Sequence, residues 1–258
     1  MKKVVVTGAG GQLGKTLKEL APKFYGYHFD FKTSQDLDIT KKEDLDEVLG
    51  NGGYDYCINC AAYTNVEQAE KTPRLAFAVN AEGVKNLAKA CKDNGAVLIH
   101  ISTDYVFDGK KKGPYTIKDE TNPINEYGNS KLKGEQYIKE LLEKYYILRT
   151  SWLYSKKYGH NFYRTIVKRA SEGQDLHITD EQIGCPTNTE SLVGFITENL
   201  LNEEKPFGIY HVTDGKPMTW YDFAEQILKE NGLTHKVNLV LDRKYRTFAK
   251  RPINSVIV

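Results

Sequence analysis

Hydrophobic and polar residues alternate along the first 154 residues in blocks that predict strands and helices in turn. Short apolar runs rich in β-branched residues, such as "KKVVVTGA" and "AVLIHISTDYVF", predict strands. Segments with an apolar residue at every third or fourth position, such as "GQLGKTLKELAPK", predict helices. In chain order, the pattern predicts strands at 2–9, 25–31, 54–62, 96–107 and 145–154, and helices at 11–23, 41–51, 72–95 and 127–145.

This alternation is typical of an α/β protein with a Rossmann-like, doubly wound parallel sheet. The run "AVLIHIS" is apolar throughout, as expected of a strand that helices cover on both faces. Past Tyr154 the pattern loosens into a smaller mixed α+β region, with helices expected at 161–173, 191–204 and 218–232 and strands at 208–214 and 237–241. We therefore predict a first domain over 1–154 and a smaller region over 155–258 that is interleaved with it.

Composition and charge exclude several classes of protein. The 36 basic and 34 acidic residues give a net charge of +2, and the short basic run at 110–112 lies between two glycines, which indicates a loop. No apolar run has the length of a signal peptide or a membrane span. We expect a soluble cytoplasmic protein that has neither a nucleic-acid nor a membrane partner.

The cysteines do not predict a redox or metal site. Cys57 and Cys60 form a C-x-x-C pair inside a predicted strand, where residues three apart point to opposite faces. A redox pair usually opens a helix, and a zinc site would need a second ligand pair, which Cys91 and Cys185 do not provide. We interpret the four thiols as buried structural groups.

A glycine-rich turn joins the first strand to the first helix. Gly8, Gly11 and Gly14 occupy the positions of G-x-x-G-x-x-G in "VVVTGAGGQLG". A backbone without Cβ atoms lets a diphosphate approach closely, and the free N–H groups of the helix N-terminus favour its negative charge. This context predicts that residues 1–154 bind a dinucleotide.

Two aspartates are candidates for the adenosine end of that dinucleotide. Asp30 ends the second predicted strand, where a carboxylate meets the ribose hydroxyls and repels a 2′-phosphate. Residues 32–34, with the sequence Lys-Thr-Ser, could instead receive that phosphate, so NADH and NADPH both remain candidates. Asp38 is the next candidate, near the adenine.

The stretch "YGNSKLKGEQ" places Tyr127 four residues before Lys131, on one side of a predicted helix. A phenol has a pKa of about 10 and is a weak acid near neutral pH, but a nearby ammonium favours its ionised form. Such a pair can protonate the alkoxide that forms when a carbonyl is reduced. The fourth strand ends in "HISTDYVFDG", which brings Ser102, Thr103 and Tyr105 to the sheet edge where ligands bind.

Together these residues resemble the Ser/Thr and Tyr-x-x-x-Lys set of the extended short-chain dehydrogenase/reductase superfamily. Within it, the chain is similar over residues 1 to about 256 to the dTDP-4-dehydrorhamnose reductase family. The stretches that carry this resemblance occur in order and are "INCAAYTNVEQAE", "VNAEGVKNLAKA", "ISTDYVFDG", "PINEYGNSKLKGE", "LRTSWLY", "NFYRTIVKRA", "QIGCPT" and "AKRPINS".

The resemblance implies NADH- or NADPH-dependent reduction of the 4-keto group of a dTDP-4-dehydro sugar. It implies that the catalytic residues are Thr103, Tyr127 and Lys131. It implies that Tyr127 and Lys131 also contact the cofactor. The other cofactor contacts that it implies are Gly8, Gly11, Gln12, Leu13, Gly14, Asp30, Asp38, Ile39, Ala61, Ala62, Tyr63 and Asn80. Besides Thr103 and Tyr127, it implies that the sugar nucleotide meets Val66, Tyr105 and Trp152.

Several local features refine this interpretation. Related 4,6-dehydratases carry T-D-E where this chain has Thr103-Asp104-Tyr105, so the base for water elimination is missing here. Some relatives form magnesium-bridged dimers through acidic side chains, but Lys15 occupies one such position, so we predict no metal and expect a monomer or homodimer. Arg251 is expected either to bind the substrate's diphosphate or to form a surface salt bridge.

Two alternatives remain open at this stage. One is a reductase or epimerase that acts on another sugar nucleotide. The other is a regulatory subunit that binds NAD(P) without catalysis, as the β-subunit of methionine adenosyltransferase resembles the same family.

Overall fold

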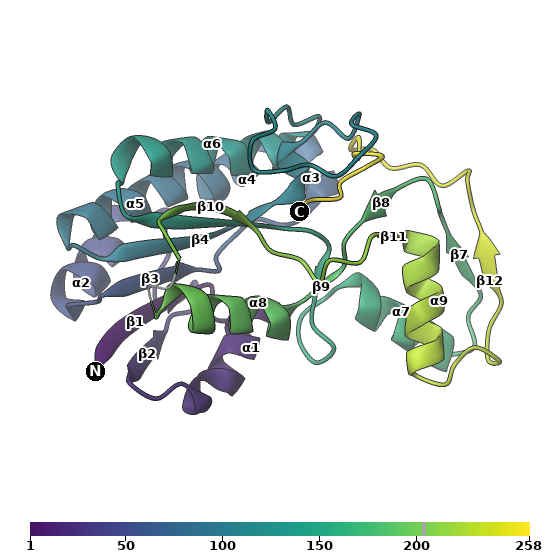
Figure 1. The fold of residues 1–258 in the computed structure, drawn as a ribbon, viewed down its shortest axis with the longest axis horizontal. Coiled ribbons are helices and arrows are strands. Elements are labelled where there is room, and N and C mark those ends of the chain that lie inside the picture. The colour runs from purple at the N-terminus through teal and green to yellow at the C-terminus, as the bar shows by residue number, and fades with distance from the viewer. Residues whose placement is uncertain (203–204) are drawn as a thin grey trace.

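The computed structural model describes residues 1–202 and 205–258, and a six-stranded parallel sheet lies at its centre (Figure 1). The strand order is β10-β5-β4-β3-β1-β2, and every neighbouring pair in it runs parallel. These strands are β1 (Lys2–Thr7), β2 (Tyr27–Phe31), β3 (Tyr56–Asn59), β4 (Val97–Thr103), β5 (Tyr145–Thr150) and β10 (Gly208–His211). The predicted α/β class with a doubly wound parallel sheet is confirmed.

Helices cover both faces of the sheet, which explains why the strands are apolar on both sides (Figure 1). One apolar layer joins the sheet to α2 (Lys42–Gly52), α5 (Val84–Asp93) and α6 (Glu126–Leu141). The other joins it to α1 (Gln12–Leu20) and to α8 (Thr189–Phe195) with the π-helical turn Ile196–Leu200 that follows. A 3₁₀ turn, Ala21–Lys23, ends the first helical segment.

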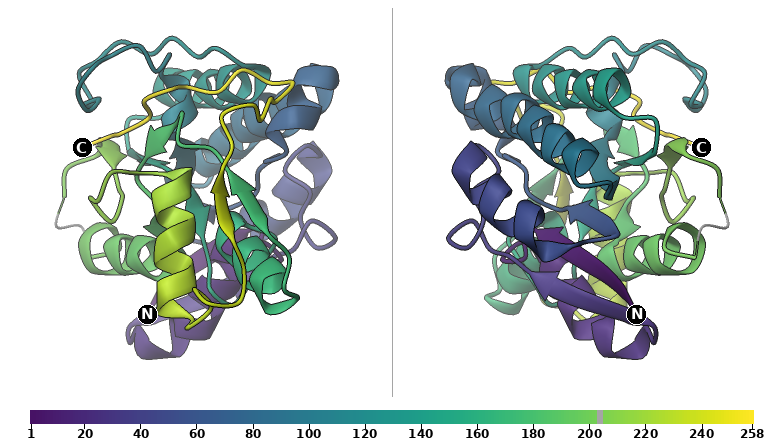
Figure 2. Two further views of the ribbon diagram at one scale, coloured as in Figure 1. Left: turned by 90° about the vertical axis from the view of Figure 1, so that its right-hand side faces the viewer. Right: turned by 90° about the vertical axis from the view of Figure 1, so that its left-hand side faces the viewer.

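A second, smaller lobe has its own apolar core. It contains α7 (Phe162–Ser171), α9 (Trp220–Glu230), the parallel pair β7 (Leu176–Ile178) and β12 (Leu239–Leu241), and the antiparallel pair β8 (Ile183–Gly184) and β11 (Met218–Thr219). Figure 2 shows α9 standing beside β12. The N-terminus of α9 is fixed by a capping box between Thr219 and Asp222.

The chain passes between the two lobes more than once. After β8, the short β9 (Thr187–Asn188) pairs with β6 (Leu153–Tyr154), and α8 and β10 then return to the large sheet. The segment over 218–241 goes back to the small lobe. The boundary after residue 154 and the roles given to the two regions remain predictions.

Some elements differ from the predicted ones. The helix predicted over 72–95 is divided into α4 (Pro73–Phe77), a π-helical segment (Ala78–Gly83) and α5, and an unpredicted α3 (Val66–Lys71) precedes it. The strand predicted over 96–107 ends at Thr103, where a 3₁₀ turn, Asp104–Val106, begins. The strands β7, β8, β9 and β11 were not predicted, because two or three residues carry no detectable period. The last two residues of the helix predicted over 191–204 lie outside the described part of the chain.

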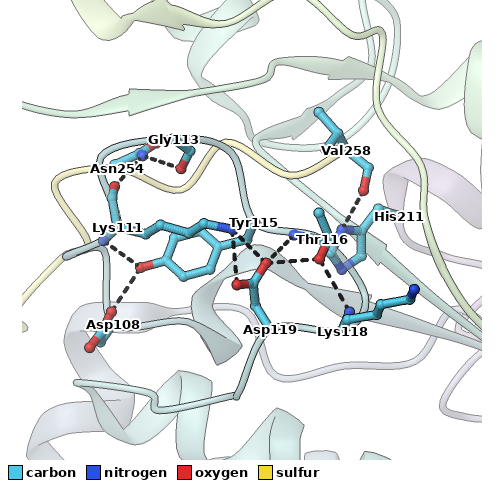
Figure 3. A network of polar contacts seen from close by, with 10 residues as sticks. All are labelled: Asp108, Lys111, Gly113, Tyr115, Thr116, Lys118, Asp119, His211, Asn254 and Val258. Atoms are coloured by element: carbon cyan, nitrogen blue, oxygen red, sulfur yellow. Dashed lines mark hydrogen bonds and ion pairs between the residues drawn. The ribbon is translucent and has the colours of Figure 1, made fainter.

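The segment before the C-terminus lies against the loop over 108–119 and against β10 (Figure 3). The Tyr115 N–H donates to the Val256 carbonyl at 2.7 Å, and the Val258 N–H donates to the Tyr115 carbonyl at 2.9 Å. The Val258 carbonyl also lies 3.0 Å from Nδ1 of His211. These contacts hold residues 254–258 over one end of the large lobe. Among the described residues, no helix combines the length and the apolarity that crossing a bilayer requires.

Candidate active site

The chain changes direction across the sheet between β1 and β3, and a cavity opens beside the carboxyl ends of the central strands. From β1 the chain moves outward to β2, and it then continues on the other side of β1 with β3, β4 and β5. The cavity has a volume of about 530 Å³. Its lining includes the predicted site residues Gly11, Gln12, Leu13, Ala61, Ala62, Val66, Thr103, Tyr105, Tyr127, Lys131, Trp152 and Arg251.

The glycine-rich turn has no room for side chains where it crosses the loop after β3. Gly8 has a φ of +64°, and a Cβ added there would lie 2.5 Å from the backbone nitrogen of Ala61. A Cβ on Gly14 would lie 2.6 Å from the Cα of Ala9. Gly11 is the N-cap of α1 and leaves the first amides without a side-chain cap. This turn therefore fits a bound diphosphate.

Asp30 lies near the end of β2, outside the cavity lining, and two side chains of this protein already contact its carboxylate. The Tyr54 hydroxyl donates to Oδ2 at 2.5 Å, and Nζ of Lys32 lies 3.1 Å from the same oxygen. Burial alone would raise the pKa of Asp30, but the contacts with Tyr54 and Lys32 outweigh it and hold the pKa below its usual value. Asp30 is therefore ionised, with a cation beside it.

The remaining predicted cofactor residues do not line the cavity, and Asp38 and Asn80 make hydrogen bonds within the protein. Asp38 accepts hydrogen bonds from the backbone N–H and hydroxyl of Thr40, at 3.0 and 2.8 Å. The fully buried Asn80 pairs with both backbone polar groups of Tyr63 at 2.9 Å and thereby fixes the loop after β3. The predicted site residues outside the lining are Gly8, Gly14, Asp30, Asp38, Ile39, Tyr63 and Asn80.

Thr103, Tyr127 and Lys131 come together where α6 packs on the end of β4. Helix α6 begins after Asn125, whose side chain accepts from the Gly128 N–H at 2.8 Å. A Cβ on Gly128 would lie 2.2 Å from the Tyr105 carbonyl, so only glycine permits this approach. Tyr127, Thr103 and Lys131 all line the cavity. The predicted trio therefore occupies one wall of the cavity.

Electrostatics at this wall are set by burial. Burial raises the pKa of Tyr127, and the contact with Thr103 opposes that rise. Burial lowers the pKa of Lys131 to about 8. The amine of Lys131 donates to the Ile101 carbonyl at 2.6 Å and lies 3.5 Å from Nε2 of His100. An amine with this pKa exists in both charge states near neutral pH.

Asp104 is a buried acid beside the trio that sequence reasoning did not assign. It accepts hydrogen bonds from the Thr103 hydroxyl at 2.9 Å and from the Ser151 hydroxyl at 2.8 Å. Burial raises its pKa to about 6 although these hydroxyls oppose the rise. Asp104 therefore fixes the rotamer of Thr103.

Aromatic residues line the side of the cavity that faces the small lobe. The rings of Tyr105 and Tyr127 meet edge to face with centroids 5.9 Å apart. Trp152, at a positive φ of 46°, stacks on Trp220 with a centroid distance of 3.4 Å. A Cβ on Gly184 would lie 2.5 Å from the Trp152 indole, so this glycine makes room for the ring. Sequence reasoning named Trp152 but missed Trp220, because nothing in the sequence pairs two tryptophans 68 positions apart.

Arg251 lies where this cavity meets a second one of about 730 Å³, and Val66, His160 and Trp220 also line both. Its guanidinium donates to Glu67 at 2.9 Å, while its buried Nε has no partner among the described residues. The salt bridge considered for Arg251 is thus present, and it leaves one N–H free. The two cavities share these lining residues and therefore adjoin each other.

Comparisons with known proteins are consistent with this geometry. A family model described as "RmlD substrate binding domain" matches residues 1–258. The chain is 37% identical over 268 aligned positions to dTDP-4-dehydrorhamnose reductase of Aggregatibacter actinomycetemcomitans, covering 100% of this chain and 90% of that protein. It is 38% identical to the spore coat polysaccharide biosynthesis protein SpsK of Bacillus subtilis, covering 100% of this chain and 89% of that protein.

A solved structure with a similar fold also contains a dinucleotide. It is the dTDP-4-dehydrorhamnose reductase of Bacillus anthracis in complex with NADP, which is 40% identical to this chain with a TM-score of 0.94. The match covers 100% of this chain and 91% of that one.

Proposed function

This chain belongs to the RmlD substrate binding domain family, and on that premise we propose that it is an NADH- or NADPH-dependent oxidoreductase that reduces dTDP-4-dehydrorhamnose to dTDP-L-rhamnose. The observation that carries the proposal is that Thr103, Tyr127 and Lys131 line one cavity together with the glycine-rich turn. The product supplies cell-surface polysaccharide synthesis.

The dinucleotide is held by the large lobe. The N-terminus of α1, whose first amides have no side-chain cap, would hold its diphosphate. Gly8 and Gly14 permit the close backbone packing that shapes this turn. Asp30 and Lys32, side by side at the end of β2, would meet its adenosine ribose. When bound, the reduced nicotinamide supplies the hydride for the carbonyl carbon.

Tyr127 supplies the proton for the carbonyl oxygen. The Thr103 hydroxyl, which lines the same cavity, would turn its proton from Asp104 to the same oxygen and orient it. Lys131, as an ammonium, stabilises the phenolate as it forms and can return a proton to it from the solvent side of the cavity. Tyr105 stands where an elimination enzyme would need a carboxylate, so the residues support reduction rather than loss of water.

The sugar nucleotide enters from the small lobe. Its sugar lies among Val66, Tyr105 and Trp152, and its nucleotide extends into the second cavity past Arg251. The guanidinium of Arg251, which lines both cavities, is a donor for the diphosphate. Both ligands are highly charged and cross bilayers poorly, so the proposal includes a cytoplasmic location. It also includes a monomer or homodimer that has neither nucleic-acid nor membrane partners.

The test is oxidation of NADPH and NADH, followed at 340 nm, by the purified protein with the 4-keto-6-deoxy sugar nucleotide that follows dTDP-glucose dehydration and 3,5-epimerisation. Activity with this compound, and its absence in Tyr127→Phe, is the expected result. A panel with the unepimerised dTDP sugar and a UDP-linked 4-keto sugar tests the alternative substrates.

Two results would contradict the proposal. A higher kcat/KM for another sugar nucleotide would assign a different reductase or epimerase. Binding of NADPH without turnover of any member of the panel would favour the regulatory-subunit alternative.

A further inference from the structure

His100 is a buried histidine that the proposed chemistry does not use. It lies in β4, fully buried, with Nε2 facing the amine of Lys131 at 3.5 Å and Nδ1 facing the side-chain amide of Asn59 at 3.0 Å. Asn59 ends β3 and is also fully buried. The two residues therefore connect the centre of the sheet to the active-site lysine.

Backbone geometry fixes the orientation of the Asn59 amide. Its Oδ1 lies 3.1 Å from the backbone nitrogen of Ala61, and a backbone N–H can only donate. The Thr7 hydroxyl donates to the same oxygen at 2.6 Å. The atom of Asn59 that faces His100 must therefore be Nδ2, because exchanging the two amide atoms would set two donors against each other at Ala61.

This orientation determines the tautomer of His100. An amide NH₂ group can only donate, so Nδ1 of His100 accepts and carries no proton. Burial holds the pKa of His100 well below its usual value, and the charge of Lys131 lowers it further, so the ring is neutral. The single ring proton is then on Nε2, and the N–H points at the amine of Lys131.

The other groups around Lys131 do not cancel this effect. Glu135, one helical turn along α6, would favour the ammonium, but its carboxylate is paired with the Arg149 guanidinium at 2.7 Å and accepts from Ser102 at 2.5 Å. The Cys60 thiol has a pKa raised by burial to about 12 and is uncharged. Tyr127, on the same helix, is neutral until it gives up its proton. The Ile101 carbonyl, at 2.6 Å, accepts a hydrogen bond from the amine in either charge state.

We propose that Asn59 and His100 are positioning residues that hold an N–H against the amine of Lys131 and thereby favour its neutral form. An ammonium can only donate hydrogen bonds, so the N–H of His100 that faces it is unfavourable. A neutral amine has a lone pair and accepts a hydrogen bond from this N–H. Lys131 then returns a proton to Tyr127 more readily than an unperturbed lysine would, and it regains that proton from solvent in the cavity. The consequence for catalysis rests on the proposed function, but the tautomer and the charge of Lys131 do not.

The first experiment measures these two properties without substrate. Long-range ¹H–¹⁵N correlation spectra of the wild-type protein are expected to show His100 unprotonated at Nδ1 and protonated at Nε2 between pH 6 and pH 9. The titration of Lys131 is followed by ¹³C NMR of labelled lysine, assigned with Lys131→Met. A proton on Nδ1 in the wild-type protein would overturn the proposal.

Two variants then remove or reverse the N–H that His100 presents to Lys131. His100→Leu removes it without adding charge, so the Lys131 titration is expected to move to higher pH by about one unit. Asn59→Asp keeps the acceptor for Thr7 and Ala61, but its carboxylate accepts a hydrogen bond from Nδ1. The ring proton therefore moves to Nδ1, Nε2 turns its lone pair toward Lys131, and the shift is again upward. Ile99→Val, on the same strand in the opposite apolar layer, is the matched control and should leave the titration unchanged.

The enzymatic measurement uses the pH profile of kcat/KM. Because the reduction needs the ammonium of Lys131, activity falls as pH rises through its pKa, and His100→Leu should move this alkaline limb upward by the same amount. A lower rate at every pH with an unmoved limb, together with an unmoved Lys131 titration, would overturn the proposal. If His100→Leu does not fold, the wild-type tautomer and Asn59→Asp still decide it. Failure of the protein to reduce any sugar nucleotide would refute the proposed function. The NMR measurements would still test the tautomer of His100 and the charge of Lys131.

Discussion

At the scale of single residues, the proposed chemistry depends on one phenol whose environment works against its ionisation. Burial raises the pKa of Tyr127, so the group keeps its proton until an acceptor of higher basicity forms beside it. A carbonyl oxygen that has received a hydride is such an acceptor. The neighbouring hydroxyl of Thr103 is itself held by the carboxylate of Asp104, so the proton donor and its helper occupy fixed positions.

Replacing Tyr127 by Phe should abolish most of the reduction while leaving the dinucleotide bound. The variant keeps the ring that meets Tyr105 edge to face, and it loses only the proton donor. We expect kcat to fall by about 10²–10⁴-fold and the dissociation constant of NADPH, measured by fluorescence titration, to stay within about twofold. Wild-type turnover by this variant would remove Tyr127 from the mechanism.

Asp30 should influence the choice between NADH and NADPH. Its carboxylate repels a 2′-phosphate, while Lys32 beside it attracts one, so the two residues oppose each other. Asp30→Ala is therefore expected to weaken NADH more than NADPH, and Lys32→Ala to weaken NADPH more than NADH. The ratio of the two dissociation constants decides the matter, and an equal loss for both cofactors in Asp30→Ala would mean that Asp30 does not contact the ribose.

At the scale of elements, the structure places the glycine-rich turn directly against the loop after β3. The sequence indicated this turn because glycine, strand and helix signals coincide in it. It could not indicate that the backbone of Ala61, 53 positions later, is what excludes a side chain at Gly8, since that contact depends on β1 and β3 being neighbours. The same limit applies to Gly128, which is unremarkable in sequence and yet sets the distance between α6 and the end of β4.

Two glycines of this turn, Gly8 and Gly10, provide a matched pair of variants. Gly8→Ala puts a Cβ 2.5 Å from a backbone atom at a positive φ, whereas Gly10→Ala meets nothing within 4 Å. The left-handed conformation alone costs about 1–2 kcal/mol for a residue with a Cβ, so Gly8→Ala should lower the free energy of unfolding by at least that amount and weaken NADPH. Urea denaturation of both variants checks this, and equal stability would contradict the predicted crowding.

At the scale of the whole molecule, the chain builds two apolar cores and puts the site between them. Gln12, which opens α1, donates to the Leu153 carbonyl at 3.0 Å and accepts from Asn161 of the small lobe at 3.1 Å. The alternation of strands and helices indicated the large lobe well, because each element there is long enough to show a period. The sequence did not predict that α8 and β10 return to the large lobe, since the hydrophobic pattern of a short element does not tell which lobe it packs against.

The segment that contains Arg251 is held by Glu67 of α3. The Glu67 carboxylate accepts from the Arg251 guanidinium at 2.9 Å and from the backbone N–H groups of Phe248 and Ala249 at 2.8 and 3.2 Å. These three contacts hold the segment over 248–251 against α3, and Arg251 itself lines both cavities. If the small lobe recognises the sugar nucleotide, Arg251 is the residue whose loss should affect that ligand alone.

Arg251→Ala should therefore raise KM for the sugar nucleotide by about 10- to 100-fold, the loss expected for a charge-assisted hydrogen bond to a diphosphate. NADPH binding should change little, because the dinucleotide contacts lie in the large lobe. Arg243→Ala is the matched control, since Arg243 is an exposed arginine that is paired with Asp180 and lines neither cavity. Isothermal titration of both ligands against both variants separates the outcomes. Weaker NADPH with unchanged sugar-nucleotide binding in Arg251→Ala would reverse the assignment of the two lobes, and an equal effect of Arg243→Ala would mean that only the overall positive charge of this surface matters.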